Sequence, residues 1–524
     1  MLEEVDQTFH PTLNKWYLDD GSIVAPLPAI PSLLHSISSL SQQVGLRLNL
    51  SKCVLLHGPG ITSIPPGLQS LQLRDWSDNG TKVLGTPIGS QRYTLQLLTE
   101  KFDECKFLAD RILQLPHLQM AWRLLTHCSG FCKVNFLLRV VPYLWGQAFA
   151  ESVAGYTRLC IQKLIGSIMS TQNWTVASLP ISMGGMGVQD PMWIHPSAYV
   201  SASLNYAYNV SNNSVDANLP PDFFDALQDL VDGLTPSSSP ATSWLMSRAC
   251  SEVLPEQLKQ KWWSNLQYVF QFQGLLSSVS LRDKVQLQCQ KSSLTGAWLN
   301  VVPNAHLGLT IPCSEFKCLL RWRMGISLLP VQGAGSPCVD CGKPLDIYGD
   351  HFVCCRYCGF WSRHSKITSI LHRIALAAGL GVQLEQSIPS KKRPADLLIR
   401  GLEEEPLALD VSIIHPAPPS SRPTFDAVSL RETHKFQKYS DSCTVLGWLF
   451  RPFCLSTFGE FGPCASDIVT RLALLLTTSP QSFPIVRQRI TQSISVALMK
   501  VVGFQLVCGL HSYLCEAGDD TVLE

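Results

Sequence analysis

The sequence predicts a multidomain α+β protein, and three observations support this prediction. The chain has 524 residues, and at roughly 100–200 residues per domain this length favours three or four domains. Hydrophobic residues make up 46% of the chain, which is enough to bury several cores and is unlike a disordered protein. Helical spacing of apolar residues dominates from Leu95 to about Ala207, whereas short apolar runs typical of strands occur near the N-terminus and between Leu397 and Ile413.

The first predicted strand pair carries two adjacent aspartates. Trp16–Gly21 reads WYLDDG and is followed by the apolar run SIVAPL, which predicts a hairpin with Asp19 and Asp20 at its tip. Adjacent carboxylates there can hold metal ions against a triphosphate. Asp-Asp-Gly is also an ordinary turn, and for these residues alone that interpretation stays open. Three segments follow: a helical stretch at Ile30–Val44, GLRLNLSKC at Gly45–Cys53, and a strand pair with Gly and Pro at Lys82–Ser90.

This order of motifs resembles the back half of the palm in reverse transcriptases of non-LTR retrotransposons. In that family the YxDD turn is motif C, Gly-Leu-x-Leu-Asn-x-x-Lys-Cys is motif D, and Leu-Gly-x-Pro-Ile-Gly is motif E, the primer grip. The resemblance implies that Asp19 and Asp20 are a catalytic metal-binding pair and that Lys52 lies near the incoming nucleotide. The family's fingers and motif A aspartate precede the YxDD turn, and 16 residues precede Tyr17 here. We therefore expect a polymerase remnant that is incomplete for RNA-directed DNA polymerisation.

A helical region follows this palm-like part. Its apolar stripes predict a helix that ends at Pro116 and further helices over Leu124–Leu138 and Tyr156–Ile168. The segment Leu179–Val188, LPISMGGMGV, resembles a segment in the thumb of the same retroelements. Its glycines are expected to form turns, since the spacing of a phosphate-binding glycine loop is absent.

Two stretches rich in Pro, Ser or Gly predict linkers, at Thr235–Ser243 and Gly333–Pro337. The connector between them, Trp244–Leu329, is mostly helical in pattern and contains no group of residues typical of catalysis. Its tryptophans, Trp262–Trp263 and Trp322, are therefore expected to have a packing role.

One group of cysteines has the spacing of a zinc site. A Cys-x2-Cys turn is followed, ten and fourteen residues beyond its second cysteine, by a histidine and a cysteine, which suits tetrahedral zinc. A chance Cys-x2-Cys is the alternative in a chain with 19 cysteines. The predicted zinc ligands are Cys338, Cys341, His351 and Cys355, with Cys354 and Cys358 as alternatives for the fourth position.

The segment Lys391–Ile413 predicts two adjacent strands with one carboxylate each. Asp396 precedes the apolar run Leu397–Ile399, and Asp410 lies within the run Leu407–Ile413. Two aspartates held close repel one another, and a divalent cation such as magnesium between them would keep both ionised. Magnesium there would activate water and neutralise charge on a phosphate, which is nuclease chemistry. A β-hairpin with two solvated aspartates is the alternative.

Charge is informative locally rather than globally. The net charge of +1 does not indicate a nucleic-acid-binding protein, but residues 356–400 contain eight Lys or Arg against Glu385 and Asp396. Lys391, Lys392 and Arg393 in this segment form a candidate phosphate-facing patch, although a solvated helix face would have a similar composition.

From the Cys-rich turn to the C-terminus, the motifs resemble those of site-specific LINE-type elements. Their order is CxxCGKxLDxYGDHxxxC, RHSKI, RPAD, ALDVS, HKFQKY and FxxFG. In that family a zinc knuckle precedes a restriction-like endonuclease of the PD-(D/E)xK class. The resemblance implies structural zinc in the knuckle, catalytic magnesium on Asp396 and Asp410, and Glu385 as an auxiliary acidic residue at the end of a helical region.

Two departures from the restriction-enzyme pattern concern the lysine and the proline. Ala395 separates the proline from Asp396, and Ser412 stands where restriction enzymes have the catalytic lysine. In the retroelement version this lysine comes from a later helix, which implies that Lys435 is catalytic, with Lys438 as its alternative.

We therefore expect five parts: a partial palm (1–95), a thumb-like helical region (96–234), a helical connector (235–335), a zinc knuckle (336–360) and a restriction-like α/β endonuclease (361–524). The resemblance implies a protein that nicks target DNA so that the exposed 3′ end primes reverse transcription of the element's RNA. A decayed or domesticated copy that binds nucleic acid without cleaving it is the main alternative, and a polymerase completed by a missing half is another. The oligomeric state stays open.

The location expected for this protein is intracellular and nuclear. The N-terminus lacks the pattern of a signal peptide, and an odd number of cysteines cannot all form disulfides, so we expect reduced thiols. The most apolar candidate for a membrane span, Ile494–Val507, is too short and is interrupted by Lys500 and Gln505. We therefore expect no membrane partner.

Overall fold

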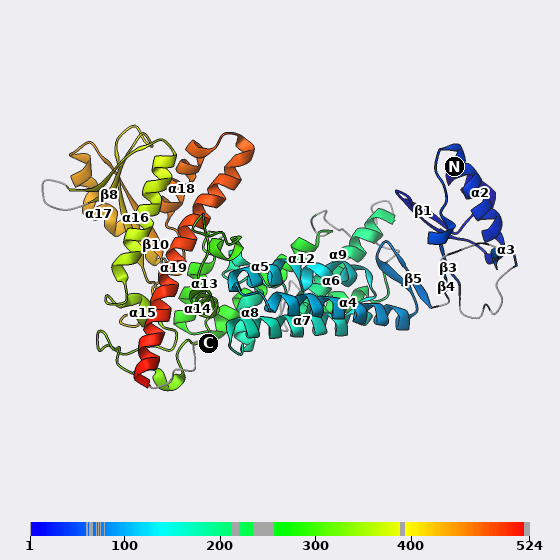
Figure 1. Ribbon diagram of the computed structural model, residues 1–524, viewed down its shortest axis with the longest axis horizontal. Helices are drawn as coiled ribbons and strands as arrows, with labels where there is room; N and C mark the ends of the chain where they lie inside the picture. Colours follow the sequence, from blue (N-terminus) through cyan, green and yellow to red (C-terminus); the bar gives the residue numbers. More distant parts are fainter. Residues whose placement is uncertain are drawn as a thin grey trace.

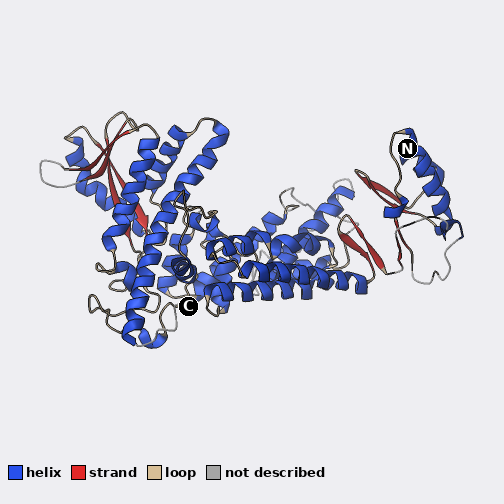
Figure 2. Ribbon diagram, in the orientation of Figure 1, coloured by secondary structure: helices blue, strands red, loops and turns tan. Residues whose placement is uncertain are grey.

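The computed structural model describes residues 2–58, 61, 66–69, 71, 73, 75–77, 79–210, 219–233, 256, 258–292, 294–387 and 394–517. The described part of the molecule is elongated, with an N-terminal unit at one end, helices in the middle and a C-terminal α/β unit at the other end (Figure 1). Helices dominate, and strands gather towards the two ends (Figure 2). The predicted linker Thr235–Ser243 and the basic residues Lys391, Lys392 and Arg393 lie outside the described residues.

The N-terminal unit contains the predicted aspartate hairpin. Strands β1 (Leu13–Tyr17) and β2 (Asp20–Val24) pair in antiparallel fashion, with Tyr17 opposite Asp20, which confirms the hairpin. Helices α1 (Leu2–Phe9) and α2 (Ile30–Gln43) contribute Val5, Leu33 and Ile37 to a small core beside it. The hairpin tip faces solvent, since Tyr17 and Leu18 are 64% and 86% exposed.

Two further strand pairs connect this unit to the helices. Strand β3 (Val54–Leu56) runs parallel to β4 (Asp75–Ser77), with α3 (Pro66–Gln69) between them in sequence. Strands β5 (Gly80–Val83) and β6 (Thr86–Gly89) form an antiparallel hairpin, which confirms the strand pair predicted at Lys82–Ser90. Its two-residue turn, Leu84–Gly85, has positive φ angles of 49° and 83°, as tight hairpin turns require.

The middle of the chain is helical, as predicted, but one expected helix is divided. The expectation of a continuous helix over Leu124–Leu138 is wrong, because Gly130 adopts a left-handed φ of 69° and separates two helices. The glycines of Leu179–Val188 are confirmed as turn formers, with positive φ at Gly184 and Gly187. The helices of this region are α4 (Gln91–Leu113), α5 (Leu118–Cys128), α6 (Phe131–Val140), α7 (Tyr143–Ile165), α8 (Thr171–Ser178), α9 (Pro191–Val210) and α10 (Phe223–Asp232).

The connector packs against this helical region. Its helices are α12 (Gln260–Ser278), α13 (Leu281–Gln290) and α14 (Cys313–Arg323). Trp263 is buried in a core shared with α9 and α10, and its ring meets that of Trp262 edge to face at 4.8 Å. Trp322 lies in the main core, which extends from Leu97 to Leu510 and joins the helical region to the C-terminal unit. The tryptophans therefore pack the interior, as expected.

The expectation of a free linker at Gly333–Pro337 is wrong. Gly335 donates its N–H to Leu345 O (2.9 Å), and Leu345 donates back to Ser336 O (2.9 Å). Gly333 lies beneath the ring of Tyr513 in the last helix, where an added Cβ would meet the hydroxyl oxygen at 2.6 Å. Gly333 is needed here because the ring of Tyr513 comes close to the backbone, and the segment forms a tight turn. A segment of this kind has the same residue composition as a flexible linker.

The C-terminal unit is a four-stranded mixed sheet between helices. The strands are β7 (Gly381–Gln386), β8 (Ala395–Arg400), β9 (Leu407–Ile414) and β10 (Leu449–Ser456), in the order β10-β9-β8-β7. The antiparallel pairing of β8 with β9 confirms the two adjacent strands predicted around the aspartates. Strands β9 and β10 are parallel, and the chain passes between them through α17 (Ala427–Thr444).

Helices cover both faces of this sheet. Helix α17 packs Phe436, Tyr439 and Cys443 on one face. Helices α16 (Phe360–Ala377) and α18 (Pro463–Leu476) bury apolar side chains against the other face. The described part of the chain ends with α19 (Phe483–Ala517), which packs against α14, α16 and α18 and so links the sheet to the connector.

Helix α19 has 35 residues and is longer than the apolar segment Ile494–Val507 that it contains. By length and composition it is the one helix among the described residues that could cross a membrane, but 67% of its most apolar window is buried inside the protein. The polar residues that interrupt the apolar segment Ile494–Val507 have partners, since Gln505 donates to Cys358 O (2.7 Å) and Lys500 to Gly308 O (2.9 Å). Burial against three helices explains its apolar composition.

A buried ion pair ties α13 to the short helix α15 (Asp350–Cys354). Arg282 donates through Nε to Asp350 Oδ2 (2.7 Å) and through Nη2 to Asp350 Oδ1 (2.9 Å). Trp322 donates to the same carboxylate (2.9 Å), and His415, directly after β9, lies 3.5 Å from it. Burial alone would raise the pKa of Asp350, but the charge and hydrogen bonds of Arg282 outweigh it and hold this pKa well below its usual range.

Replacement of Arg282 by methionine should destabilise the protein by about 3–5 kcal/mol, because it leaves the Asp350 carboxylate buried without its counter-ion. Arg471→Met is the matched control, since Arg471 pairs with Glu403 and Asp467 at a site where 39% of its side chain is exposed. This control should cost less than about 1 kcal/mol. Urea unfolding of both variants measures the difference, and equal costs would contradict the prediction.

Candidate functional site

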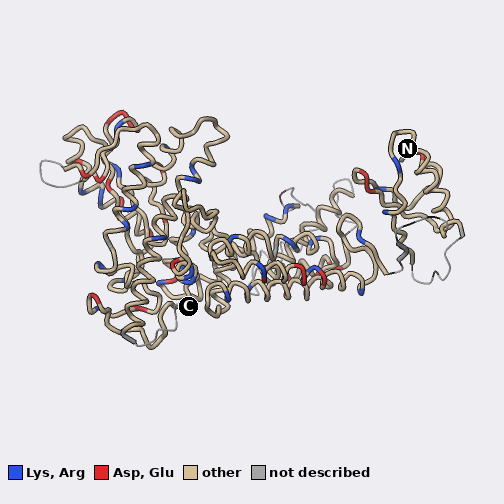
Figure 3. Tube along the Cα trace, in the orientation of Figure 1, with Lys and Arg blue, Asp and Glu red and all other residues tan. Residues whose placement is uncertain are grey.

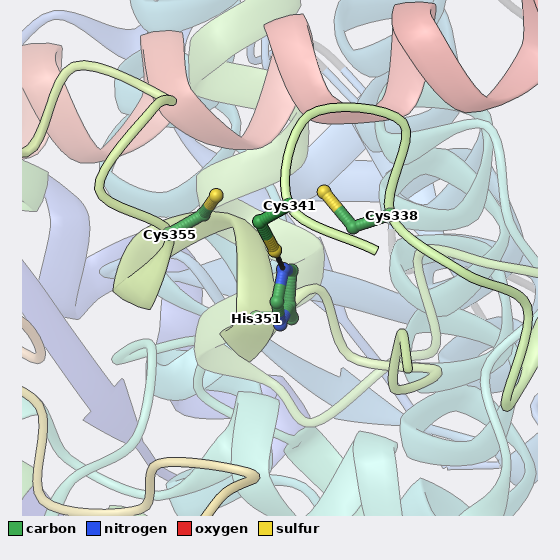
Figure 4. Close-up of side chains that lie close together, drawn as sticks. All are labelled: Cys338, Cys341, His351 and Cys355. Carbon is green, nitrogen blue, oxygen red and sulfur yellow. Dashed lines mark hydrogen bonds between the residues drawn. The ribbon is translucent and has the colours of Figure 1, made fainter. Parts of the chain in front are cut away.

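The four predicted zinc ligands converge in the structure. Cys338 and Cys341 lie on a tight turn in which Gly342 donates its N–H to Cys338 O (2.8 Å). His351 lies in α15 and Cys355 directly after it. The four ligand atoms all lie within 4.8 Å of one another, and Cys341 Sγ is 3.2 Å from His351 Nε2 (Figure 4). Three thiols and one imidazole at such distances match the donor set of a structural zinc site.

The chain holds the histidine of this cluster in the form that binds metal. The carboxylate of Asp346 accepts the backbone N–H groups of Tyr348 (2.9 Å), Asp350 (3.1 Å) and His351 (2.7 Å), which fixes the start of α15. Burial lowers the pKa of His351 and so favours the neutral imidazole. Neutral imidazole is the state that coordinates a metal ion.

The geometry distinguishes between the candidates for the fourth ligand. Cys355 belongs to the cluster, whereas the neighbouring Cys354 does not. Burial raises the pKa of Cys354 to about 12, which keeps it a thiol. Cys358 also lies outside the cluster, and its thiol donates to Asp340 Oδ2 (3.5 Å). The arrangement therefore favours Cys355.

A second group of polar residues lies at one end of the C-terminal sheet. Strands β8 and β9 pair as far as Leu397 and Leu409, so that Asp396 and Asp410 face each other where the strands separate. Asp396 Oδ2 accepts the N–H of Val411 (2.7 Å), which orients this carboxylate. The strand register thus brings together the two aspartates, which have thirteen residues between them in the sequence.

Each of these carboxylates has a basic partner from a different helix. His364 on α16 places Nε2 3.0 Å from Asp396 Oδ2, and Lys435 on α17 places Nζ 2.6 Å from Asp410 Oδ2. The hydrogen bond to Asp396 raises the pKa of His364. Burial raises the pKa of Asp410, and the charge of Lys435 acts against this rise. The site therefore contains two carboxylates that could serve as ligands for a hard cation, together with two basic groups that compensate their charge.

Two further predicted residues lie at the edge of this group. The expectation that Glu385 ends a helical region is wrong, because α16 ends at Ala377, Gly379 turns the chain with φ of 75°, and Glu385 lies on β7. It falls between the pairs Leu384–Leu397 and Gln386–Ala395, and is therefore opposite Asp396. Lys438 lies about one turn beyond Lys435, exposed to solvent, with Nζ 4.7 Å above the ring of Tyr439.

The polymerase-like residues are separate from both groups. Asp19, Asp20 and Lys52 are exposed in the N-terminal unit, at the opposite end of the molecule from the C-terminal sheet (Figure 1). Acidic and basic residues are both scattered along the described part of the chain (Figure 3). This distribution agrees with the net charge of +1.

Sequence reasoning missed His364 and Arg431. Arg431 on α17 donates through Nε to Ser412 Oγ (3.0 Å) on β9. The spacing of Arg431 and Lys435, four residues apart on one helix, would have placed both on the same face. No comparable pattern links His364 to Asp396, because they approach each other only through the packing of α16 on the sheet.

In metal-free protein, Asp396→Asn should lower the pKa of His364, since it removes the negative acceptor whose hydrogen bond raises this pKa. The raised pKa stabilises the fold below the ordinary histidine pKa, and this contribution is lost as the pH rises through the folded value. NMR titration of the imidazole measures the change. Asp441→Asn, an exposed change on the same helix as Lys435, should leave it unaltered.

Comparison with known proteins gives one informative similarity. No protein-family model matches the chain. The retrotransposable element SLACS 132 kDa protein of Trypanosoma brucei gambiense is 23% identical over 192 residues, which cover 36% of this chain and 15% of that relative. The chain therefore spans only a small part of the relative's length. The similarity supports a retrotransposon-related origin for this chain.

Proposed function

We propose that this retrotransposon-related chain is a magnesium-dependent DNA endonuclease with an adjoining zinc knuckle. The observation that carries the proposal is the convergence of Asp396, Asp410 and Lys435 from two strands and a helix. Such convergence of residues distant in sequence supports a reactive site better than it supports a solvated hairpin, because a solvated hairpin needs no lysine packed against its aspartate. The relative's name supports a retroelement context.

The donor set of the site fits magnesium. Asp396 and Asp410 provide oxygen ligands at the end of the sheet, and Glu385, opposite Asp396, is the auxiliary carboxylate. Bound magnesium would supply an activated water and compensate charge on the phosphate. The chain itself orients Asp396 through the N–H of Val411 and holds Lys435 against Asp410, from where its ammonium can hold a water or stabilise developing phosphate charge.

We further propose that the N-terminal unit is a reverse-transcriptase remnant and that α4 to α10 correspond to its thumb. The hairpin that presents Asp19 and Asp20 at an exposed tip supports this proposal. A protein of this type would act on target DNA and on the element's RNA in the nucleus. The cut strand would then offer its 3′ end as a primer.

The purified protein should contain about one zinc ion per chain, and Cys341→Ser should lose it, because three ligands no longer complete the tetrahedron. Cys354→Ser is the matched control and should keep the metal, since Cys354 lies outside the cluster. Elemental analysis after gentle purification measures the zinc. Loss from both variants, or from neither, would refute this ligand set.

The second test of this function concerns cleavage. The protein with magnesium should nick supercoiled DNA, and Asp410→Asn should slow nicking by about 100-fold or more, because a metal ligand worth several kcal/mol is removed. DNA affinity should change little, as no phosphate contact is lost. Asp441→Asn, exposed on α17, should nick at the normal rate.

The same assay separates the nuclease from its main alternative. Strong, salt-sensitive DNA binding by a wild-type protein that does not nick would favour a nucleic-acid-binding module without catalytic function. Equal nicking by wild type and Asp410→Asn would instead point to a contaminating nuclease.

A further inference from the structure

We propose that Arg431 binds the scissile phosphate in this site and that Ser412 is the positioning residue that orients its guanidinium. The proposal rests on the nuclease function above and adds to it a residue that contacts the substrate. It derives from the pairing of strand β9 with helix α17.

Strand β9 and helix α17 are joined by two polar contacts that lie side by side. Asp410 and Ser412 are two residues apart on β9 and therefore point to the same face of the sheet. Lys435 and Arg431 are four residues apart on α17 and therefore lie one above the other. The first contact is the ion pair of Lys435 Nζ with Asp410 Oδ2 at 2.6 Å, and the second is the bond from Arg431 Nε to Ser412 Oγ at 3.0 Å.

The guanidinium of Arg431 is held through Nε, which leaves its terminal N–H groups available to a ligand. Its Nε is engaged by Ser412, whereas its two terminal nitrogens take part in no hydrogen bond or ion pair within the described part of the chain. The side chain is half-buried. A planar fork fixed through Nε, with terminal N–H groups available, matches two oxygens of a phosphate.

The charges of the site explain why an anion would bind there. The carboxylate of Asp410 is already paired with Lys435, and that of Asp396 with His364. Arg431 is close enough to Asp410 to act against the rise in the pKa of that carboxyl, yet makes no ion pair with it. Of the three basic side chains His364, Arg431 and Lys435, Arg431 is therefore the one that makes no ion pair with a carboxylate among the described residues.

This arrangement also accounts for Ser412 at the position where restriction enzymes have lysine. A second lysine there would repel the guanidinium, whereas a serine hydroxyl accepts its Nε–H. Arg431 bound to a non-bridging phosphate oxygen would stabilise the negative charge that grows during cleavage.

The first test measures phosphate contact without cleavage. The full chain is bound to a short DNA duplex with calcium in place of magnesium, over a range of salt concentrations. Arg431→Gln should reduce the slope of log affinity against log salt by about 0.9, the value for one lost phosphate contact on duplex DNA. Arg471→Gln on α18, where Arg471 is paired with Glu403 and Asp467, should keep the wild-type slope. An unchanged slope in Arg431→Gln would overturn the proposal.

The second test measures single-turnover nicking with saturating DNA and magnesium. Arg431→Gln should slow the reaction about 10²–10³-fold, the typical loss of one transition-state donor. Arg431→Lys, which keeps the charge without the fork, should recover part of the rate and so exclude misfolding. Ser412→Ala should slow nicking about tenfold when introduced into the wild-type protein. The same change should not slow nicking further when introduced into Arg431→Gln, as expected for residues that act together. Additive effects would overturn the role of Ser412.

The two tests distinguish a failure of the nuclease function from a failure of the phosphate contact. A wild-type protein that does not nick would refute the nuclease, while a reduced salt slope in Arg431→Gln would still support the phosphate contact.

Discussion

The structure depends on the buried ion pair between Arg282 and Asp350. Asp350 directly precedes His351, so the short helix α15 supplies both the counter-ion of Arg282 and a ligand of the Cys/His cluster. Arg282 also stacks on the ring of Tyr348 at 4.0 Å, and Trp322 donates to the same carboxylate. Charges removed from water are costly unless every polar atom has a partner, so this group tolerates few alternative arrangements. It joins α13 of the connector to α15 beside the Cys/His cluster.

The same group of residues extends to the sheet. His415 follows β9, lies 3.5 Å from Asp350 and contacts Thr457 Oγ1 through Nδ1 at 2.6 Å, directly after β10. Strand β9 also carries Asp410, so the strand that holds the candidate catalytic aspartate is anchored at its C-terminal end against α15. A rigid support of this kind is what a metal site needs, because small displacements of its ligands are costly for catalysis. Asp350 and His415 therefore join the Cys/His cluster to the sheet at this point.

The sequence predicted what depends on local pattern. Short apolar runs bounded by turn residues predicted the hairpins and the adjacent strands of Asp396 and Asp410, and cysteine spacing predicted four residues that the fold brings together. It did not predict contacts made by helix packing, such as His364 with Asp396, since the relative position of α16 and β8 is set by many apolar contacts. The glycines near Gly333 were misinterpreted because close packing and flexibility select the same residue.

The charge arrangement reconciles a net charge of +1 with a proposed role on DNA. Phosphate binding depends on the field at the site, and the net charge of a chain of this size says little about that field. At the end of the sheet Lys435 and His364 balance the two carboxylates, so the metal-free site gains no excess negative charge that would repel DNA. A cation bound to the carboxylates would release both basic groups towards a phosphate, next to Arg431. Under the proposed function, the acidic residues that would hold a metal and the basic residues that would hold its substrate can therefore coexist within one small site.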